Sequence, residues 1–200
     1  LNLIKIKMNY NGELNVVIGP MYSGKSTELL RIYNKYKRNY KITVINHNSD
    51  TRYGVNSVNT HNKDSIPSIS VKKLKDTNII NKINNVDVIL IDEGQFFDDL
   101  YSFCKDIVDN FKKIIYVFGL SGDSNREKFG QILDLIPICD NITHLKSICN
   151  ICGDVNNASF TLRKTTNKQQ VSVGGSDEYM AVCRICWLNN NKHVFETNLF

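Results

Sequence analysis

Residues 19–26 read GPMYSGKS, which matches the glycine-loop pattern GxxxxGK[ST] that holds the phosphates of a nucleoside triphosphate. Gly19 and Gly24 allow the backbone to curl so that its N–H groups point at phosphate oxygens. Lys25 can bridge the β- and γ-phosphates, and the hydroxyl of Ser26 suits Mg²⁺. The pattern predicts an ATP and Mg²⁺ site that comprises Gly19, Pro20, Met21, Tyr22, Ser23, Gly24, Lys25 and Ser26.

Two acids, Asp92 and Glu93, follow the apolar run VDVILI. Beside a glycine loop, an acid at the end of a strand commonly holds Mg²⁺, which suits Asp92. A carboxylate one residue further along can accept the proton of the group that attacks the γ-phosphate. If that group is water, the protein is an ATPase; if it is a substrate hydroxyl, the protein is a kinase that must exclude water. The alternative is two exposed acids that cap the next helix.

The chain contains six cysteines, and four of them form two CxxC pairs, Cys149 with Cys152 and Cys183 with Cys186. Two such pairs supply the four thiolates of a tetrahedral structural Zn²⁺ site. The long segment between the pairs would then be a loop whose two ends are fixed at the metal. The alternative is four unrelated buried thiols. Cys104 and Cys139 have no partner at such a spacing.

Hydrophobic patterning predicts the elements that position these residues. Apolar runs separated by helical patterns indicate a parallel α/β sheet, with the ligand at the carboxyl ends of the strands. The predicted strands are 14–18, 41–48, 65–71, 86–92 and 112–120, and the predicted helices are 27–39, 78–83, 98–111 and 130–137. We therefore expect a P-loop NTPase-like parallel sheet flanked by helices over residues 13–141.

The pattern changes from residue 142 onward. Short strand-like runs, separated by polar residues and flanked by the cysteine pairs, predict a small zinc-binding domain over residues 142–190. Gly174 and Gly175 would let the backbone approach a flat ligand closely, although a Gly-Gly pair is more often a simple turn.

Composition narrows the possible functions. The formal net charge is +5, and the basic residues are scattered rather than gathered in the stripe that nucleic-acid binding requires. No apolar stretch reaches transmembrane length, and the N-terminal residues do not form a secretory signal. We expect an intracellular protein that binds neither nucleic acid nor membrane.

The motifs in combination resemble one family. GPMYSGKSTELLR, DTRY at 50–53, TH at 60–61, IDEGQFF, KFGQILDLIP, the CxxC pairs and VGGSDEYMAVCRICW occur in order. The chain is similar to thymidine kinases of the type II, cytosolic class over residues 13–187. The resemblance implies a P-loop domain, a zinc domain whose lasso loop closes over thymidine, a cytoplasmic homotetramer, and feedback inhibition by thymidine triphosphate.

The resemblance also implies roles for single residues. Glu93 would take the proton from the thymidine 5′-hydroxyl, and Asp50, Arg52, Asp92 and Gln95 would join the glycine loop at ATP and Mg²⁺. The thymidine pocket would comprise Met21, Phe96, Leu120, Phe129, Thr161, Gln170, Val171, Ser172, Val173, Gly174 and Tyr179. Ser121 and Ser124 stand where many members have an aspartate and an aromatic residue, so we expect a looser pocket wall.

The expected reaction is transfer of the ATP γ-phosphate to thymidine, which yields thymidine monophosphate for DNA precursor synthesis. The alternative is a nucleic-acid-dependent P-loop ATPase with a structural zinc module, which would require a basic, aromatic stripe. A third possibility is a binding module that has lost activity, but Lys25, Ser26 and Glu93 are all present.

Overall fold

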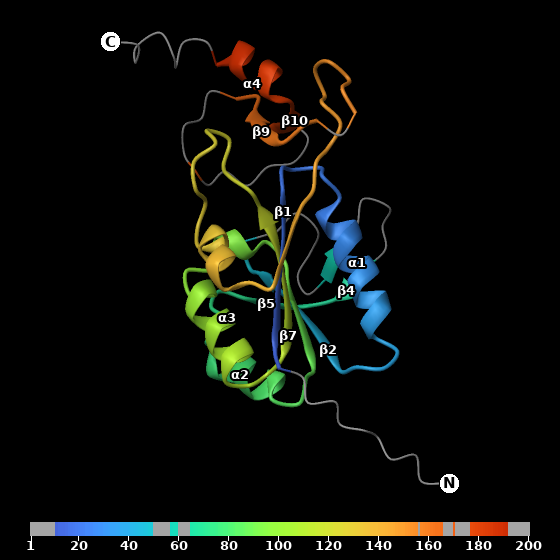
Figure 1. The fold of residues 1–200 in the computed structure, drawn as a ribbon, viewed down its shortest axis with the longest axis vertical. Helices are drawn as coiled ribbons and strands as arrows, with labels where there is room; N and C mark the ends of the chain where they lie inside the picture. Colours follow the sequence, from blue (N-terminus) through green and yellow to red (C-terminus); the bar gives the residue numbers. More distant parts are fainter. Residues whose placement is uncertain are drawn as a thin grey trace.

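The computed structural model describes residues 11–49, 57–59, 65–155, 157–165, 170 and 177–191. Helices cover both faces of a six-stranded sheet, and a small unit of two strands and a helix lies beyond one end of it (Figure 1). The elements are β1 (Glu13–Gly19), α1 (Lys25–Tyr36), β2 (Ile42–His47), β3 (Ser57–Asn59), β4 (Ser65–Pro67), β5 (Ile69–Val71), α2 (Thr77–Ile83), β6 (Val88–Ile91), η1 (Gly94–Phe96), α3 (Leu100–Asp109), β7 (Ile114–Leu120), η2 (Ile132–Ile138), β8 (Asn141–His144), β9 (Phe160–Arg163), β10 (Tyr179–Val182) and α4 (Arg184–Asn190).

The large sheet has the strand order β5-β2-β6-β7-β1-β8, and every neighbouring pair is parallel. β7 lies between β1, which leads into the glycine loop, and β6, which leads into the two acids. Gly19 pairs with Leu120, and Ile91 pairs with Val117. Because all three strands run the same way, their carboxyl ends meet at one edge of the sheet, as the sequence predicts.

The sheet is buried on both faces, which explains its nearly continuous apolar strands. Leu14, Val16 and Ile18 of β1 face α2 and α3 in one core. Val17 faces the other core, which includes Leu29 of α1. The predicted fold class, a P-loop-type parallel sheet between helices, is confirmed.

Several predicted elements differ in detail. The predicted strand 65–71 is two short strands: β4 pairs antiparallel with β3, and β5 joins the large sheet. The predicted helix 130–137 is the 3₁₀-helix η2, which includes Pro137. The predicted helix 98–111 ends at Asp109, and Phe111 is half-exposed because the chain reverses at Lys112, whose φ is 54°. No helix in the described ranges is long and apolar enough to cross a bilayer.

The small unit has its own core, and one predicted strand lies outside it. β9 and β10 pair antiparallel, and α4, which the sequence did not predict, covers them with the buried Trp187. β8, from the run that we predicted to begin this domain, is instead the sixth strand of the large sheet. The indole N–H of Trp187 donates to the carbonyl of Ser124 at 3.1 Å and so attaches the small unit to the loop after β7.

Packing of α3 gives a test of the core. Phe103 is fully buried against the sheet, whereas Phe111 is 51% exposed. We expect Phe103→Ala to lower the free energy of unfolding by about 3–5 kcal/mol, since it leaves a cavity, and Phe111→Ala to lower it by less than about 1 kcal/mol. Urea denaturation measures both. Equal losses would contradict the placement of Phe111 outside the helix.

Candidate active site

The glycine loop connects β1 to α1, and each of its two glycines is required for a different structural reason. Gly24 has a φ of 85°, a left-handed conformation that side chains disfavour. Gly19 has no room for a side chain, because a Cβ there would lie 2.6 Å from Ser23 Oγ and 2.7 Å from the carbonyl of Leu145. The loop is therefore packed closely on its inner side and open at Gly24.

Lys25 is buried against the loop that it follows. Its ammonium group donates to the carbonyls of Pro20 and Gly19, at 2.8 and 3.2 Å. Ser23 Oγ is buried and has no hydrogen-bond partner among the residues that the structure describes, and Ser26 lies in the first turn of α1. A buried ammonium, an unsatisfied hydroxyl and a helix N-terminus are suited to a phosphate group. The residues fit the predicted nucleotide.

The two acids occupy a strained turn after β6. Glu93 has φ 50° and ψ 44°, which is uncommon for a residue other than glycine and is typical of functional sites. Its backbone N–H donates to Asp92 Oδ1 at 3.0 Å. Asp92 is buried and Glu93 is partly exposed. The turn thus presents two adjacent carboxylates at the carboxyl edge of the sheet.

Gln95 holds the Glu93 carboxylate in place. Its amide nitrogen donates to Glu93 Oε2 at 2.6 Å, and its amide oxygen accepts from the backbone N–H of Leu120 at 3.1 Å. The next residue, Ser121, donates its N–H to the carbonyl of Gly19 at 3.4 Å. A chain of hydrogen bonds therefore runs from the glycine loop to Glu93. Gln95 is 3% exposed, and in this structure its side chain bonds Glu93 and the backbone of Leu120.

Close packing fixes Gln95 itself. A Cβ at Gly119 would lie 2.4 Å from its amide oxygen, and one at Gly130, whose φ is 59°, would lie 2.0 Å from its carbonyl oxygen. Side chains at either position would displace Gln95. Sequence reasoning did not identify these glycines, because nothing in the local pattern separates them from ordinary turn residues.

Two of the predicted pocket aromatics are in contact. The rings of Phe96 and Phe129 meet edge to face with centroids 5.4 Å apart. His47, which the sequence left without a role, lies 5.8 Å from the Phe96 ring and 4.8 Å from Phe97. Burial lowers the pKa of His47. His47 thus packs against the rings of Phe96 and Phe97.

The small unit contributes three further predicted residues. Thr161 Oγ1 accepts the backbone N–H of Met21 at 3.0 Å, which joins β9 directly to the glycine loop. The hydroxyl of Tyr179 lies 2.7 Å from a guanidinium nitrogen of Arg163. Gln170 Nε2 donates to Asp123 Oδ2 at 2.9 Å. Asp123 was not predicted, since its partner lies far away in the sequence.

The predicted residues that the structure does not describe are Asp50, Arg52, Val171, Ser172, Val173 and Gly174. The predicted strand-like run at 169–175 is also outside the described residues, except for residue 170.

The four cysteines of the two CxxC pairs converge, as predicted. Their sulfur atoms all lie within 4.8 Å of one another, and Cys152 Sγ is 3.8 Å from Cys183 Sγ. A tetrahedron of thiolates about 2.3 Å from Zn²⁺ has sulfur–sulfur edges of about 3.8 Å. The cluster comprises Cys149, Cys152, Cys183 and Cys186, and it fits a structural zinc ion.

The surroundings of Cys149 favour a thiolate. Burial raises the pKa of this thiol, but backbone N–H groups of Cys152, Cys183 and Ile151 lower it by more, and the pKa falls to about 6. Burial raises the pKa of Cys186 to about 12. Cys186 must therefore lose a proton to serve as a metal ligand.

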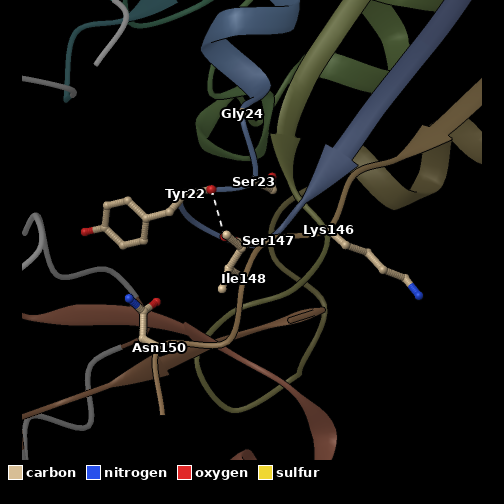
Figure 2. Close-up of a pocket in the computed structure, with 7 residues that line it drawn as sticks. All are labelled: Tyr22, Ser23, Gly24, Lys146, Ser147, Ile148 and Asn150. Carbon is tan, nitrogen blue, oxygen red and sulfur yellow. Dashed lines mark hydrogen bonds between the residues drawn. The ribbon is translucent and has the colours of Figure 1, made fainter. Parts of the chain in front are cut away.

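The segment that leads to Cys149 also contacts the glycine loop. A pocket of about 350 Å³ lies between them, and Ser147 Oγ donates to the carbonyl of Tyr22 at 2.9 Å. Figure 2 shows the residues that line this pocket. Lys146, Ile148 and Asn150 line the same pocket from the side of the small unit. The glycine loop therefore contacts two segments, one at Ser147, before the first cysteine pair, and one at Thr161, between the two pairs.

A glycine loop between β1 and α1, a buried lysine, and acids at the end of β6 on one edge of a parallel sheet define a P-loop phosphotransfer protein. The comparisons with known proteins narrow this class. The family model described as "Thymidine kinase" matches residues 12–187. The chain belongs to the thymidine kinase family, and it is an enzyme of that family.

Thymidine kinases of a plant and of viruses are similar to this chain over most of its length. The chain is 43% identical to a thymidine kinase of Oryza sativa subsp. japonica over 198 residues, which is 96% of this chain and 72% of the relative. It is 42% identical to the thymidine kinase of Sheeppox virus (strain KS-1) over 181 residues, which is 90% of this chain and 98% of the relative. It is also 43% identical to the thymidine kinase of Choristoneura fumiferana entomopoxvirus over 184 residues, which is 89% of this chain and 97% of the relative.

The cysteine cluster generates a metal test. We expect the purified protein to contain about one zinc ion per chain, and Cys186→Ser to contain less than half as much, because a tetrahedral site would lose a ligand. Elemental analysis measures the metal. Cys139→Ser is the matched control, since Cys139 is outside the cluster. Equal zinc in both variants would contradict the assignment.

Proposed function

We propose that this member of the thymidine kinase family transfers the γ-phosphoryl group of ATP to the 5′-hydroxyl of thymidine, with Glu93 as the general base. The observation that carries the proposal is the hydrogen bond from Gln95 to Glu93, because it orients a carboxylate at the edge of the sheet where the glycine loop lies. A base must be held in place to accept a proton from a bound hydroxyl.

The glycine loop would bind the donor. Lys25 would exchange its bonds with the carbonyls of Gly19 and Pro20 for bonds with the phosphates of ATP. Ser26 and Asp92 are the described residues that would hold Mg²⁺, which neutralises phosphate charge when it is bound with ATP. Asp50 and Arg52, outside the described residues, are proposed to lie near the same phosphates.

The acceptor would bind between the large sheet and the small unit. Phe96 and Phe129, whose rings meet edge to face, would offer apolar surface to a pyrimidine, together with Met21 and Leu120. Thr161 and the backbone of residues 170–174 would read the edge of the base, and Tyr179 would lie near the sugar. Enclosure of the acceptor by both units would exclude water, which would otherwise compete with the nucleoside hydroxyl.

Other properties are proposed from the resemblance alone. We propose that the enzyme is a cytoplasmic homotetramer and that thymidine triphosphate inhibits it by feedback. The alternative reading, a nucleic-acid-dependent ATPase, is not favoured, because the family match covers residues 12–187.

Removal of the base tests the mechanism. We expect Glu93→Gln to lower kcat at least ~10²-fold, because the amide cannot accept a proton, and to leave ATP binding nearly unchanged. Glu127→Gln is the matched control, since Glu127 is an exposed acid on the loop after β7. Steady-state kinetics and calorimetric titration with an ATP analogue measure the two effects. Full activity in Glu93→Gln would remove this residue from the role.

The acceptor is tested by product formation. We expect transfer from labelled ATP to thymidine to exceed transfer to deoxycytidine and deoxyguanosine by at least about tenfold, with deoxyuridine intermediate because it lacks one methyl group. A reaction without nucleoside is the control. Rapid ATP turnover in that control would mean that Glu93 activates water, and the kinase proposal would fail.

A further inference from the structure

Asp123 is a buried acid to which the proposed chemistry gives no role. It lies on the loop between β7 and η2 and is 6% exposed. Its Oδ1 atom accepts the backbone N–H groups of Asn125 and Glu127, at 2.8 and 2.9 Å. One carboxylate oxygen is thus used to fold the loop.

The other oxygen reaches the small unit. Asp123 Oδ2 accepts from Gln170 Nε2 at 2.9 Å, and the same nitrogen donates to the carbonyl of Lys128 at 3.2 Å. Gln170 belongs to the connection between β9 and β10. A hydrogen bond to an ionised acceptor is stronger than one between neutral groups, and a buried carboxylate that loses such a partner is destabilised.

The location of this contact connects it to the pocket. Lys128 directly precedes Phe129, whose ring packs on Phe96. Gln170 is also held through its backbone, since its carbonyl lies 3.5 Å from the guanidinium of Arg163, which bonds the hydroxyl of Tyr179 at 2.7 Å. Gln170 therefore connects the aromatic wall on the large sheet with the tyrosine on the small unit.

We infer that Asp123 and Gln170 are positioning residues for the nucleoside. Their hydrogen bond fixes Gln170 against the loop that carries Phe129. It therefore determines the affinity for thymidine rather than the rate of phosphoryl transfer. This inference rests on the proposed function, because it assumes that the nucleoside lies between Phe129 and the small unit.

The first test replaces Gln170 with glutamate, so that two carboxylates face each other at this contact. We expect Gln170→Glu to raise the KM for thymidine at least about tenfold, because the donor is lost and like charges face each other. The kcat falls by less than about threefold, and the KM for ATP changes by less than about twofold, since no reacting atom is involved. Thr165→Ala, at an exposed position in the same connection, is the control and keeps the wild-type KM.

The second test inverts the hydrogen bond. In the double variant Asp123→Asn, Gln170→Glu, the new amide can donate to the new carboxylate. We expect the KM for thymidine to return to within about threefold of the wild-type value. If the two residues did not interact, the double variant would be no better than Gln170→Glu; if they only stabilised the fold, kcat would fall together with the rise in KM. Either outcome, or an unchanged KM in Gln170→Glu, would overturn the inference.

A third measurement separates this inference from the proposed function. If the wild-type enzyme does not phosphorylate thymidine, the proposed function fails. The contact is then tested without substrate by the rate of lysyl endopeptidase cleavage between residues 164 and 178. We expect faster cleavage in Gln170→Glu than in the wild type and in Thr165→Ala; equal rates would overturn the contact.

Discussion

The buried amide of Gln95 is the interaction on which the arrangement of the site depends. It uses both ends of its amide, one for the Glu93 carboxylate and one for the backbone N–H of Leu120. A buried polar group of this kind is costly unless it is fully satisfied, so the acid and the end of β7 cannot move independently. Gly119 leaves space for this amide, and Gly130 leaves space for the backbone carbonyl of the same residue.

The small unit depends on the same edge of the sheet. Thr161 and Ser147 bond the backbone of the glycine loop from two directions, and Trp187 bonds the loop after β7. Arg126 strengthens that attachment, because its guanidinium lies 3.8 Å from the centre of the Trp187 ring. Cys186 of the cysteine cluster precedes Trp187 in α4, so a metal ion bound to the cluster would stabilise the unit that contacts the glycine loop.

The sequence predicted those features of the fold and the site whose residues lie close together along the chain. The glycine loop, the apolar strands and the CxxC pairs each lie within a few residues, and parallel strands necessarily end at one edge. Asp123 was missed because its partner, Gln170, is distant in the sequence. α4 was missed because its Asn-rich sequence has weak helix propensity, and burial of Trp187 stabilises it instead.

The position of β1 in the sheet has a consequence for how the chain acquires its structure. Asn15 bonds the carbonyl of Ile115, 100 residues later, and the side chain of Asn141, 126 residues later. The strand that leads into the glycine loop is therefore synthesised before both of its partners in the sheet, β7 and β8. Such distant pairings carry a large entropic cost before any contact forms, which slows folding. During synthesis, β1 therefore remains an unpaired apolar strand, and exposed strands of this kind are prone to aggregation.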